Sequence, residues 1–328
     1  MRPVRTVIGL GALSLAGCEG AQSVLNPAGP DAADIALLSW VLFIGGAVIF
    51  AVVLLAIAIA ILRPATLRGE GVARRLIIGG GVVFPIVTLS ALLTWGLLLT
   101  GTTARGGAGE PVRIEVVGEQ FWWRVRYLDD AGDVVLATAN ELRLPAGRPI
   151  EVALKSNDVI HSFWVPSLAG KLDMIPGRVN RLAFTAERPG VYRGQCAEYC
   201  GAQHAQMAFY AVVEEPDAFD RWLAGQRGPA PEPASPVLEE GRRLFLRSGC
   251  GACHTIRGTA AAGRLGPDLT HVGGRRSIAA GTLPNNVGTL AGWIASAQHL
   301  KPGARMPSFG IFTGPELRAI AAYLESLK

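Results

Sequence analysis

Two short groups of metal-binding side chains lie in the C-terminal half of the chain. The first group places two cysteines, a histidine and a methionine in one segment, at Cys196, Cys200, His204 and Met207. Thiolate, imidazole and thioether ligands together suit copper. The second group is the run Cys250-Gly-Ala-Cys253-His254, which is typical of the covalent attachment of a c-type haem. The two groups predict a pair of redox centres whose chemistry is electron transfer.

The two cysteines of the first group favour a site with two copper ions. A mononuclear blue-copper site uses one thiolate and two histidines, whereas Cys196 and Cys200 could both bridge a pair of ions. The loop supplies one imidazole, and His161 is the natural donor of a second. The alternatives are a disulfide or a structural zinc site. Structural zinc takes four nitrogen and sulfur ligands without a thioether, which would leave Met207 unexplained.

The second group indicates how a haem would be held. Cys250 and Cys253 would form thioether bonds, and His254 would be the proximal iron ligand. The sixth ligand of such haems is usually methionine, and Met306 is the methionine that lies in the same part of the chain. His271 is an alternative sixth ligand. A bare Cys-x-x-Cys-His run can also be a thiol redox motif or half of a zinc site.

Two long apolar runs predict an anchor in a membrane, in agreement with a mean hydropathy of +0.32. Ile35–Leu62 and Leu76–Thr100 contain 28 and 25 residues without an ionisable side chain. Each run exceeds the ~20 residues that a helix needs to cross a bilayer, and Pro85 should kink the second helix. The connector at 63–75 holds four arginines and one glutamate. The positive-inside rule therefore places it in the cytoplasm and both ends of the hairpin outside.

The N-terminus has the pattern of a bacterial export signal. Residues 1–17 begin with Arg2 and Arg5 and continue through an apolar stretch to Leu15-Ala-Gly-Cys18. This end resembles the lipobox of lipoproteins, in which the cysteine, here Cys18, becomes the lipidated N-terminus. The alternative is a chance cysteine near an uncleaved signal. The signal and the hairpin predict the same topology, with the rest of the chain outside a bacterial inner (cell) membrane.

Composition and periodicity divide the remaining chain into four parts. The hairpin occupies 18–104, and 105–227 contains short alternating or β-branched runs separated by turn signals, as in a small β-sandwich or barrel. Residues 237–328 have the pattern of a compact helical domain. The linker at 228–236 has four prolines among nine residues and spans roughly 28 Å at about 3.1 Å per residue. It could let the helical domain swing between two positions or act as a passive spacer.

Two longer motifs resemble a known family. The segment that runs from Asp158-Val-Ile-His161 to Gly177-Arg178, followed by Cys196-Ala-Glu-Tyr-Cys200-Gly-Ala-Gln-His204-Ala-Gln-Met207, resembles subunit II of haem–copper cytochrome c oxidases. The resemblance extends from the hairpin to about residue 225 and implies a cupredoxin domain with a binuclear copper A centre. It implies two imidazole ligands, two bridging thiolates, a weak axial thioether and a backbone carbonyl, from His161, His204, Cys196, Cys200, Met207 and Glu198. In that family the carboxylate at the position of Glu198 also reaches a magnesium ion at the interface with subunit I.

The last part of the chain resembles class I cytochromes c. Lys301-Pro-Gly-Ala-Arg-Met306 is similar to their distal loop, and Gly266-Pro-Asp-Leu269 is similar to their proximal loop. The two resemblances imply a multidomain membrane protein with a two-helix transmembrane hairpin, an all-β cupredoxin domain and an all-α cytochrome c domain. Electrons would arrive at haem c, pass to copper and leave for the oxygen-reducing haem–copper site of subunit I.

The resemblance also implies partners. These are oxidase subunits I and III, membrane lipid, and either a soluble or membrane cytochrome donor or a quinol:cytochrome c reductase. The formal charge of +5 is mild and no basic run is dense enough to suggest nucleic acid. Two other functions remain open: the electron-receiving copper subunit of a nitric oxide reductase, and a membrane-anchored copper chaperone or sensor.

One group of aromatic residues departs from the family. Relatives commonly have tryptophan directly after a glutamine near the copper, where electrons are accepted. Here Gln120 is followed by Phe121, Trp122 and Trp123. One of these three could accept electrons, or the group could serve only as the packing face of a β-strand.

Overall fold

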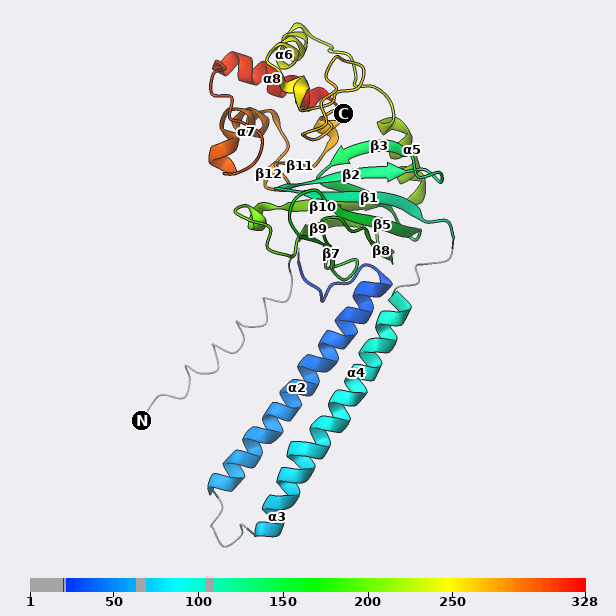
Figure 1. Cartoon of the computed structure of the whole chain (residues 1–328), viewed down its shortest axis with the longest axis vertical. Coiled ribbons are helices and arrows are strands. Elements are labelled where there is room, and N and C mark those ends of the chain that lie inside the picture. The colour runs from blue at the N-terminus through cyan, green and yellow to red at the C-terminus, as the bar shows by residue number, and fades with distance from the viewer. Residues whose placement is uncertain (1–19, 21, 63–68, 104–108) are drawn as a thin grey trace, which may run out of the picture. The chain divides into compact units, whose positions relative to one another are not determined.

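The structure, a computed structural model, forms two compact units (Figure 1). It describes residues 20, 22–62, 69–103 and 109–328. One unit is Ala33–Arg105, and the other joins the N-terminal segment up to Ala32 to Gly106–Lys328. The predicted signal at 1–17, the predicted lipidation site Cys18 and residues 63–68 of the connector lie outside the described residues.

The hairpin unit consists of two long helical runs. The first is α2 (Pro30–Leu62), and the second joins α3 (Glu70–Arg75), the π-helix η3 (Leu76–Val83) and α4 (Phe84–Thr103). Both runs are long and apolar enough to cross a membrane by length and composition, with mean hydropathies of 3.0 and 2.3. α2 begins before the apolar run that predicted it because Pro30 suits the first turn of a helix and Asp31 complements the helix dipole.

The helical hydrogen bonds change in front of Pro85. Proline has no N–H to donate to the carbonyl four residues earlier. The eight residues Leu76–Val83 take π-type bonds, and the amide of Phe84 donates to the carbonyl of Gly79. The predicted disturbance at Pro85 is therefore accompanied by a π-helical segment on its N-terminal side.

Two five-stranded sheets form the β-domain, with strand orders β3-β2-β1-β5-β8 and β4-β10-β9-β6-β7. The strands of the first sheet are β1 (Val112–Glu119), β2 (Trp122–Leu128), β3 (Val134–Ala139), β5 (Pro149–Ser156) and β8 (Asn180–Thr185). The strands of the second are β4 (Glu141–Pro145), β6 (His161–Trp164), β7 (Leu172–Met174), β9 (Gly190–Cys196) and β10 (Ala208–Glu214). β1 pairs with β5, and β4 with β10, in parallel.

Alternation along the strands builds one core from both sheets. In β2, Trp123, Val125 and Tyr127 are buried while their neighbours are partly exposed, which is the pattern of a strand with one face on a core. The same core contains Leu142 of the second sheet and Phe219 of helix α5 (Pro216–Gln226). The predicted all-β domain is confirmed.

Helices α6 (Pro236–Arg247), α7 (Val287–Leu300) and α8 (Gly314–Ser326) frame the C-terminal domain, with the short turns η5 (Cys250–Ala252) and η6 (Val272–Gly274) and the hairpin β11 (Ser277–Ile278) and β12 (Leu283–Pro284). α6 and α8 approach closely at Gly241, where an added Cβ would lie 2.1 Å from the carbonyl oxygen of Ala319. A second hydrophobic core fills this domain. The predicted all-α domain is confirmed.

The proline-rich segment is hydrogen-bonded to the helical domain at its start. Arg257 Nη2 donates to the carbonyl of Gln226 over 2.6 Å, and its Nε donates to the carbonyl of Gly228 over 3.3 Å. The amide of Ala230 donates back to the carbonyl of Arg257 over 2.9 Å. These contacts favour a fixed spacer over a freely swinging arm.

Candidate copper centre and haem pocket

The predicted copper ligands meet where strands of the second sheet begin and end. His161 is the first residue of β6 and Cys196 is the last residue of β9, and these strands pair antiparallel. The ligating atoms of His161, Cys196 and Cys200 all lie within 4.8 Å of one another. The three residues are 0%, 4% and 3% exposed, so they form a buried group of soft ligands.

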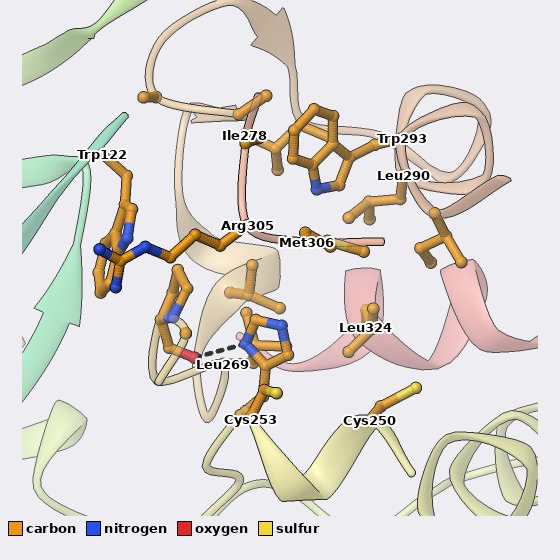
Figure 2. Close-up of a pocket in the computed structure, with 18 of the residues that line it drawn as sticks. Trp122, Cys250, Cys253, Leu269, Ile278, Leu290, Trp293, Arg305, Met306 and Leu324 are labelled. Carbon is orange, nitrogen blue, oxygen red and sulfur yellow. Dashed lines mark hydrogen bonds between the residues drawn. The ribbon is translucent and has the colours of Figure 1, made fainter. Parts of the chain in front are cut away.

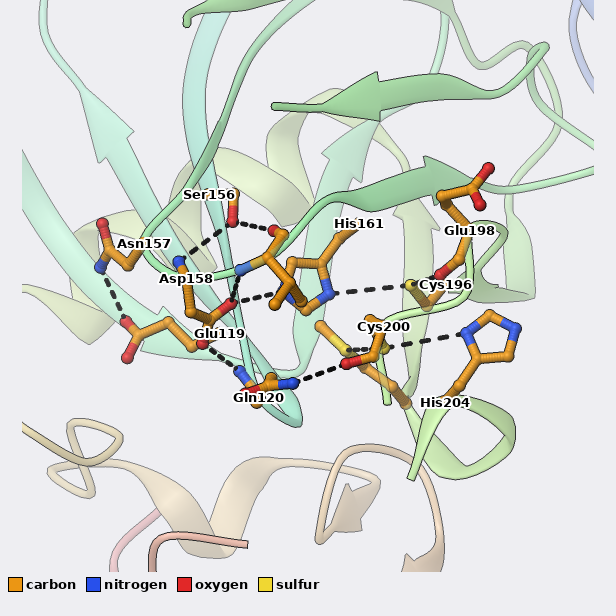
Figure 3. A network of polar contacts seen from close by, with 12 residues as sticks. Glu119, Gln120, Ser156, Asn157, Asp158, His161, Cys196, Glu198, Cys200 and His204 are labelled. Carbon is orange, nitrogen blue, oxygen red and sulfur yellow. Dashed lines mark hydrogen bonds and ion pairs between the residues drawn. The ribbon is translucent and has the colours of Figure 1, made fainter. Parts of the chain in front are cut away.

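Each thiol lies next to one imidazole (Figure 3). Cys196 Sγ is 3.8 Å from His161 Nδ1, and Cys200 Sγ is 3.8 Å from His204 Nδ1. His204 opens the short turn η4 (His204–Gln206), so it reaches the site from the loop that also carries Cys200. The arrangement offers two sulfurs between two imidazoles.

The other two predicted ligands border the same site. Met207 Sδ lies 3.8 Å from Cys200 Sγ, and Cys196 Sγ lies 3.2 Å from the backbone carbonyl oxygen of Glu198. The side chain of Glu198 is exposed and accepts the amide of Tyr199 over 3.3 Å. A donor set of thiolates, imidazoles and a thioether fits copper, and the thioether is foreign to structural zinc sites.

Asp158 and Gln120 hold this group of ligands in place (Figure 3). His161 Nε2 lies 2.8 Å from Asp158 Oδ1, and the amide of Gln120 donates to Asp158 Oδ2 over 2.7 Å. The Gln120 side chain donates to the carbonyl of Cys200 over 2.6 Å. Because the carboxylate accepts the Nε2 proton, Nδ1 of His161 remains available to a metal. Sequence reasoning assigned neither residue a role, although Asp158 stands only three positions before His161.

Hydrogen bonding between the thiols makes one of them easy to ionise. The bond to Cys200 holds the pKa of Cys196 far below its usual value, and the same bond raises the pKa of Cys200. Burial alone would lower the pKa of His161, but its hydrogen bonds to Cys196 and Asp158 raise it. The thiolate is the form that binds metal, and metal binding then releases the remaining protons.

Two glycines leave room for the side chains of the copper site, because neither has a Cβ atom. Neither of them was identified from the sequence. A Cβ on Gly118 of β1 would lie 2.7 Å from His161 Cδ2. A Cβ on Gly201 would lie 3.0 Å from the side-chain nitrogen of Gln120 and 3.2 Å from Cε1 of Phe121. Gly201 also has φ of +124°, a conformation that side chains other than glycine rarely adopt. A larger residue at either position would displace a ligand or its support.

A cavity of about 540 Å³ lies mainly in the helical domain, and Gln120, Phe121, Trp122 and Asn140 of the β-domain also line it. Apolar side chains form much of its wall, including those of Leu269, Ile278, Leu290, Trp293 and Leu324. Cys250 and Cys253 lie on one side of the cavity and Met306 on the opposite side (Figure 2). Cys250 and Cys253 would therefore hold a haem through thioether bonds, and Met306 would be available to its iron.

A hydrogen bond from one ring nitrogen of His254 to a backbone carbonyl fixes the orientation of the imidazole and leaves the other ring nitrogen free. Its Nδ1–H donates to the carbonyl of Pro267 over 2.8 Å, which leaves Nε2 for iron. Burial lowers the pKa of His254 and so favours the neutral, ligating form. Gly266 is required beside it, because a Cβ there would lie 2.6 Å from His254 Cε1. His271 instead approaches the carbonyls of Lys328 and Gly228, which leaves Met306 as the better sixth ligand.

The cavity also contains a buried donor that requires an acceptor. Arg275 lines the cavity, and its Nε has no hydrogen-bond partner among the residues that the structure describes. Buried polar groups are nearly always hydrogen-bonded, and the carboxylates of a haem would supply the acceptor. The wall, the thiols and this arginine therefore all fit a covalently bound haem.

The three consecutive aromatic residues divide between the two sites. Phe121 and Trp122 line the haem cavity, as does Arg305 (Figure 2). Trp123 points into the sandwich core, where its ring centroid lies 6.3 Å from that of His161 and 5.1 Å from that of Phe209. Successive side chains of a strand alternate between its faces, so Trp122 and Trp123 of β2 point in opposite directions, whereas Phe121 lies in the turn before β2.

Known proteins resemble both parts of the chain. Residues 124–215 match the family described as cytochrome c oxidase subunit II, periplasmic domain, and residues 238–328 match the family described as cytochrome c. The chain is 38% identical over 217 residues to cytochrome c oxidase subunit 2 of Alkalihalophilus pseudofirmus, covering 66% of this chain and 61% of that protein. It is 34% identical over 227 residues to cytochrome c oxidase subunit 2 of Bacillus sp. (strain PS3), covering 66% and 62%.

The matched part is about three-fifths of the length of these two relatives. Among solved structures, the periplasmic domain of subunit II of cytochrome oxidase of Bradyrhizobium japonicum is 29% identical, with a TM-score of 0.34 over 37% of this chain and 97% of that chain. The two matched families fall on the two hydrophobic cores, the first on the β-sandwich and the second on the helical domain. The chain therefore carries a cytochrome c oxidase subunit II periplasmic domain at 124–215 and a cytochrome c domain at 238–328.

Proposed function

We propose that this chain is the electron-accepting subunit of a haem–copper terminal oxidase. Electrons from a cytochrome or a quinol:cytochrome c reductase reach the cytochrome c domain, pass to the copper site of the β-domain and leave for the subunit that reduces oxygen. The relatives named cytochrome c oxidase subunit 2 support this assignment. The cytochrome c domain explains how the chain can receive electrons without a separately bound carrier at the copper site.

One observation carries the proposal: a single turn touches both candidate centres. Phe121 and Trp122 line the haem cavity, while the residue before them, Gln120, donates a hydrogen bond to the carbonyl of Cys200. The two sites are therefore separated by a short stretch of packed and hydrogen-bonded protein. Such proximity is what electron transfer between two bound centres needs.

The residues of each site have separate roles. Bound copper and haem would supply reversible one-electron chemistry, and the protein holds and tunes them. The copper site would consist of His161, Cys196, Glu198 through its carbonyl, Cys200, His204 and Met207. The haem would be held by Cys250, Cys253, His254 and Met306. Asp158 orients His161, and the carbonyl of Pro267 orients His254.

The same proposal covers the surroundings of the chain. The hairpin at 18–104 lies in a bacterial inner membrane beside oxidase subunits I and III. The cupredoxin domain at 105–227, the linker at 228–236 and the cytochrome c domain at 237–328 lie on its outer face. The exposed carboxylate of Glu198 reaches a magnesium ion at the boundary with subunit I, and Cys18 carries the lipid.

The ligand assignment is tested by removing one bridging thiol. We expect Cys196→Ser or Cys200→Ser to abolish the binuclear copper signal in electron paramagnetic resonance of the purified complex. The absorption of the c-type haem should be unchanged, because its ligands lie in a different hydrophobic core. Cys250→Ser is the reciprocal control and should disturb the haem alone. A delocalised two-copper spectrum in both cysteine variants would contradict the assignment.

Oxygen uptake by the intact complex separates the proposed function from the alternatives. A terminal oxidase consumes oxygen with electrons that reduce both centres of this chain. Reduction of nitric oxide without oxygen uptake would assign the chain to a reductase. Copper that exchanges with chelators and never changes its oxidation state during turnover would indicate a chaperone or sensor.

A further inference from the structure

A buried lysine joins the helical domain to the β-domain. Lys301 directly follows α7 and is 2% exposed. Its Nζ donates to the backbone carbonyls of Phe121, Gln206 and Ala279 over 2.8, 2.9 and 3.0 Å. Phe121 and Gln206 belong to the β-domain, whereas Ala279 belongs to the turn between β11 and β12 of the helical domain.

Packing alone does not explain a lysine at this position. An ammonium group has three N–H donors and no acceptor, and the three carbonyls match all of them. Removing a charge from water is nevertheless costly, and burial lowers the pKa of Lys301 to about 7. The three donors of Lys301 are all satisfied only when both domains are in place. The stability of the buried ammonium therefore depends on the relative position of the two domains.

The carbonyls that Lys301 binds lie beside both candidate centres. Gln206 immediately precedes the candidate copper ligand Met207. The ring of Phe121 lies between the loop that carries Cys200 and His204 and the helical domain. A Cβ added to Gly201 of that loop would be 3.2 Å from Cε1 of Phe121, and a Cβ added to Gly303 of the helical domain would be 3.8 Å from its Cε2. The ammonium therefore fixes the residues that separate the two sites.

Other hydrogen bonds cross the same boundary and can report on it. The amide of Ala208 in β10 donates to the carbonyl of Ala280 over 3.0 Å. The amide of Arg276 donates to a carboxylate oxygen of Glu141 over 2.8 Å. Both amides are protected from solvent by partners in the opposite domain, so their exchange with deuterium measures whether the domains remain docked.

We propose that Lys301 is a positioning residue that holds the cytochrome c domain docked on the β-domain, with the haem cavity against Phe121. The proposal rests on the proposed function, because it assigns the docked geometry to transfer from haem to copper. Lys301 acts through the backbone carbonyls that it binds, and it is itself neither a copper ligand nor a haem ligand.

The first test compares Lys301→Met, which keeps the length of the side chain, with Lys171→Met at an exposed position of the β-domain. In the full-length protein we expect the amides of Ala208 and Arg276 to exchange about tenfold faster or more in Lys301→Met, because opening of a docked surface exposes them. The amide of Val212, which is paired within the β-domain, should be unchanged. Lys171→Met should behave like the unmodified protein.

The same variants are then compared by flash-induced electron transfer from haem to copper. Lys301→Met should transfer electrons more slowly while the haem absorption and the copper resonance signal keep their unmodified form. A general loss of folding would instead reduce cofactor content and alter both spectra. Unchanged amide exchange together with an unchanged transfer rate would overturn the proposal.

A measurement on the unmodified protein covers the case in which Lys301→Met does not fold. Acetylation with an amine-reactive anhydride, read by mass spectrometry, should modify Lys301 at least about tenfold more slowly than exposed Lys171 if the domains stay docked. Similar labelling rates would refute persistent docking. If the unmodified protein protects Lys301 but shows no transfer between haem and copper, the docking stands and the proposed function fails.

Discussion

Single residues that do not contact a metal decide whether the copper ligands are correctly oriented. Asp158 accepts from both the His161 ring and the amide of Gln120, and Gln120 binds the carbonyl of Cys200. Burial alone would raise the pKa of Asp158, but its hydrogen bonds to His161 and to the Gln120 amide lower it. The carboxylate is therefore ionised at neutral pH and keeps the proton of His161 on Nε2.

Asp158→Asn tests this support without a change of volume. We expect copper affinity to fall by about 10–100-fold, the usual effect of losing the partner of a metal-bound histidine. Titration of the purified protein with a copper chelator, followed by electron paramagnetic resonance, measures the change. Asp130→Asn, at an exposed turn, is the matched control. Equal copper retention in both variants would show that Asp158 does not orient His161.

Met306→Ala tests the sixth ligand of the haem. Because methionine ligation raises the potential of a c-type haem, we expect the variant to have a lower potential and to bind carbon monoxide. Redox titration and absorption spectra measure both effects. Met174→Leu is the control, since Met174 lies in the core of the β-domain and a swap of similar volume costs less than about 1.5 kcal/mol. An unchanged potential with carbon monoxide excluded would assign the position to another residue.

At the scale of elements, a carboxylate ties three adjacent strands together. Glu115 of β1 accepts from Lys155 of β5 over 2.6 Å and from Arg126 of β2 over 2.7 Å. Burial alone would raise the pKa of Glu115, but the hydrogen bonds from Lys155 and Arg126 hold it below its usual value of 4.5. These ion pairs link β2, β1 and β5, the three central strands of the first sheet, on the face that points away from the core.

The lowered pKa of Glu115 predicts an acid-sensitive β-domain. A carboxyl group with a lowered folded pKa contributes stability above its unfolded pKa, and that stability is lost as the pH falls below 4.5 and through the folded value. Glu115→Gln should reduce the free energy of unfolding at neutral pH by about 1.5–3 kcal/mol and flatten the acid dependence. Thermal unfolding of the full chain at several pH values measures this. Exposed Glu187→Gln should keep the unmodified profile.

At the scale of the whole molecule, Arg257 decides whether the linker is a spacer or an arm. Its guanidinium binds the carbonyls of Gln226 and Gly228 and pairs with Asp268 over 3.1 Å. These bonds hold the backbone on both sides of Arg227, which is exposed. A protease that cleaves after arginine should therefore act slowly at Arg227 in the intact protein.

Arg257→Ala should expose this peptide bond. We expect cleavage by trypsin after Arg227 to become about tenfold faster, corresponding to a loss of about 1.4 kcal/mol in local stability. Mass spectrometry of timed digests locates and quantifies the cut. Arg247→Ala, at an exposed position of α6, removes an arginine elsewhere and should leave the rate unchanged. Rapid cleavage in the unmodified protein would favour the swinging arm.

The sequence by itself determined the features that depend on local spacing. The Cys-x-x-Cys-His run and the loop from Cys196 to Met207 place their ligands through the covalent chain, so residue types and intervals suffice to recognise them. The two apolar runs likewise follow from length and hydropathy, and alternation in β2 predicts which of its side chains are buried. These features require no knowledge of which distant segments pair.

Only the tertiary structure decided the contacts between distant segments. His161 reaches Cys196 across 35 positions because β6 and β9 pair antiparallel, and Gln120 reaches Cys200 across 80. Trp122 and Trp123 separate because successive side chains of β2 point to opposite faces, and Phe121 lies in the turn before β2. Lys301 has no periodic pattern that marks it, since its three acceptors are backbone carbonyls whose positions the sequence does not encode locally. Hydrogen bonds between domains depend on the shape of both surfaces, and that shape exists only after each has folded.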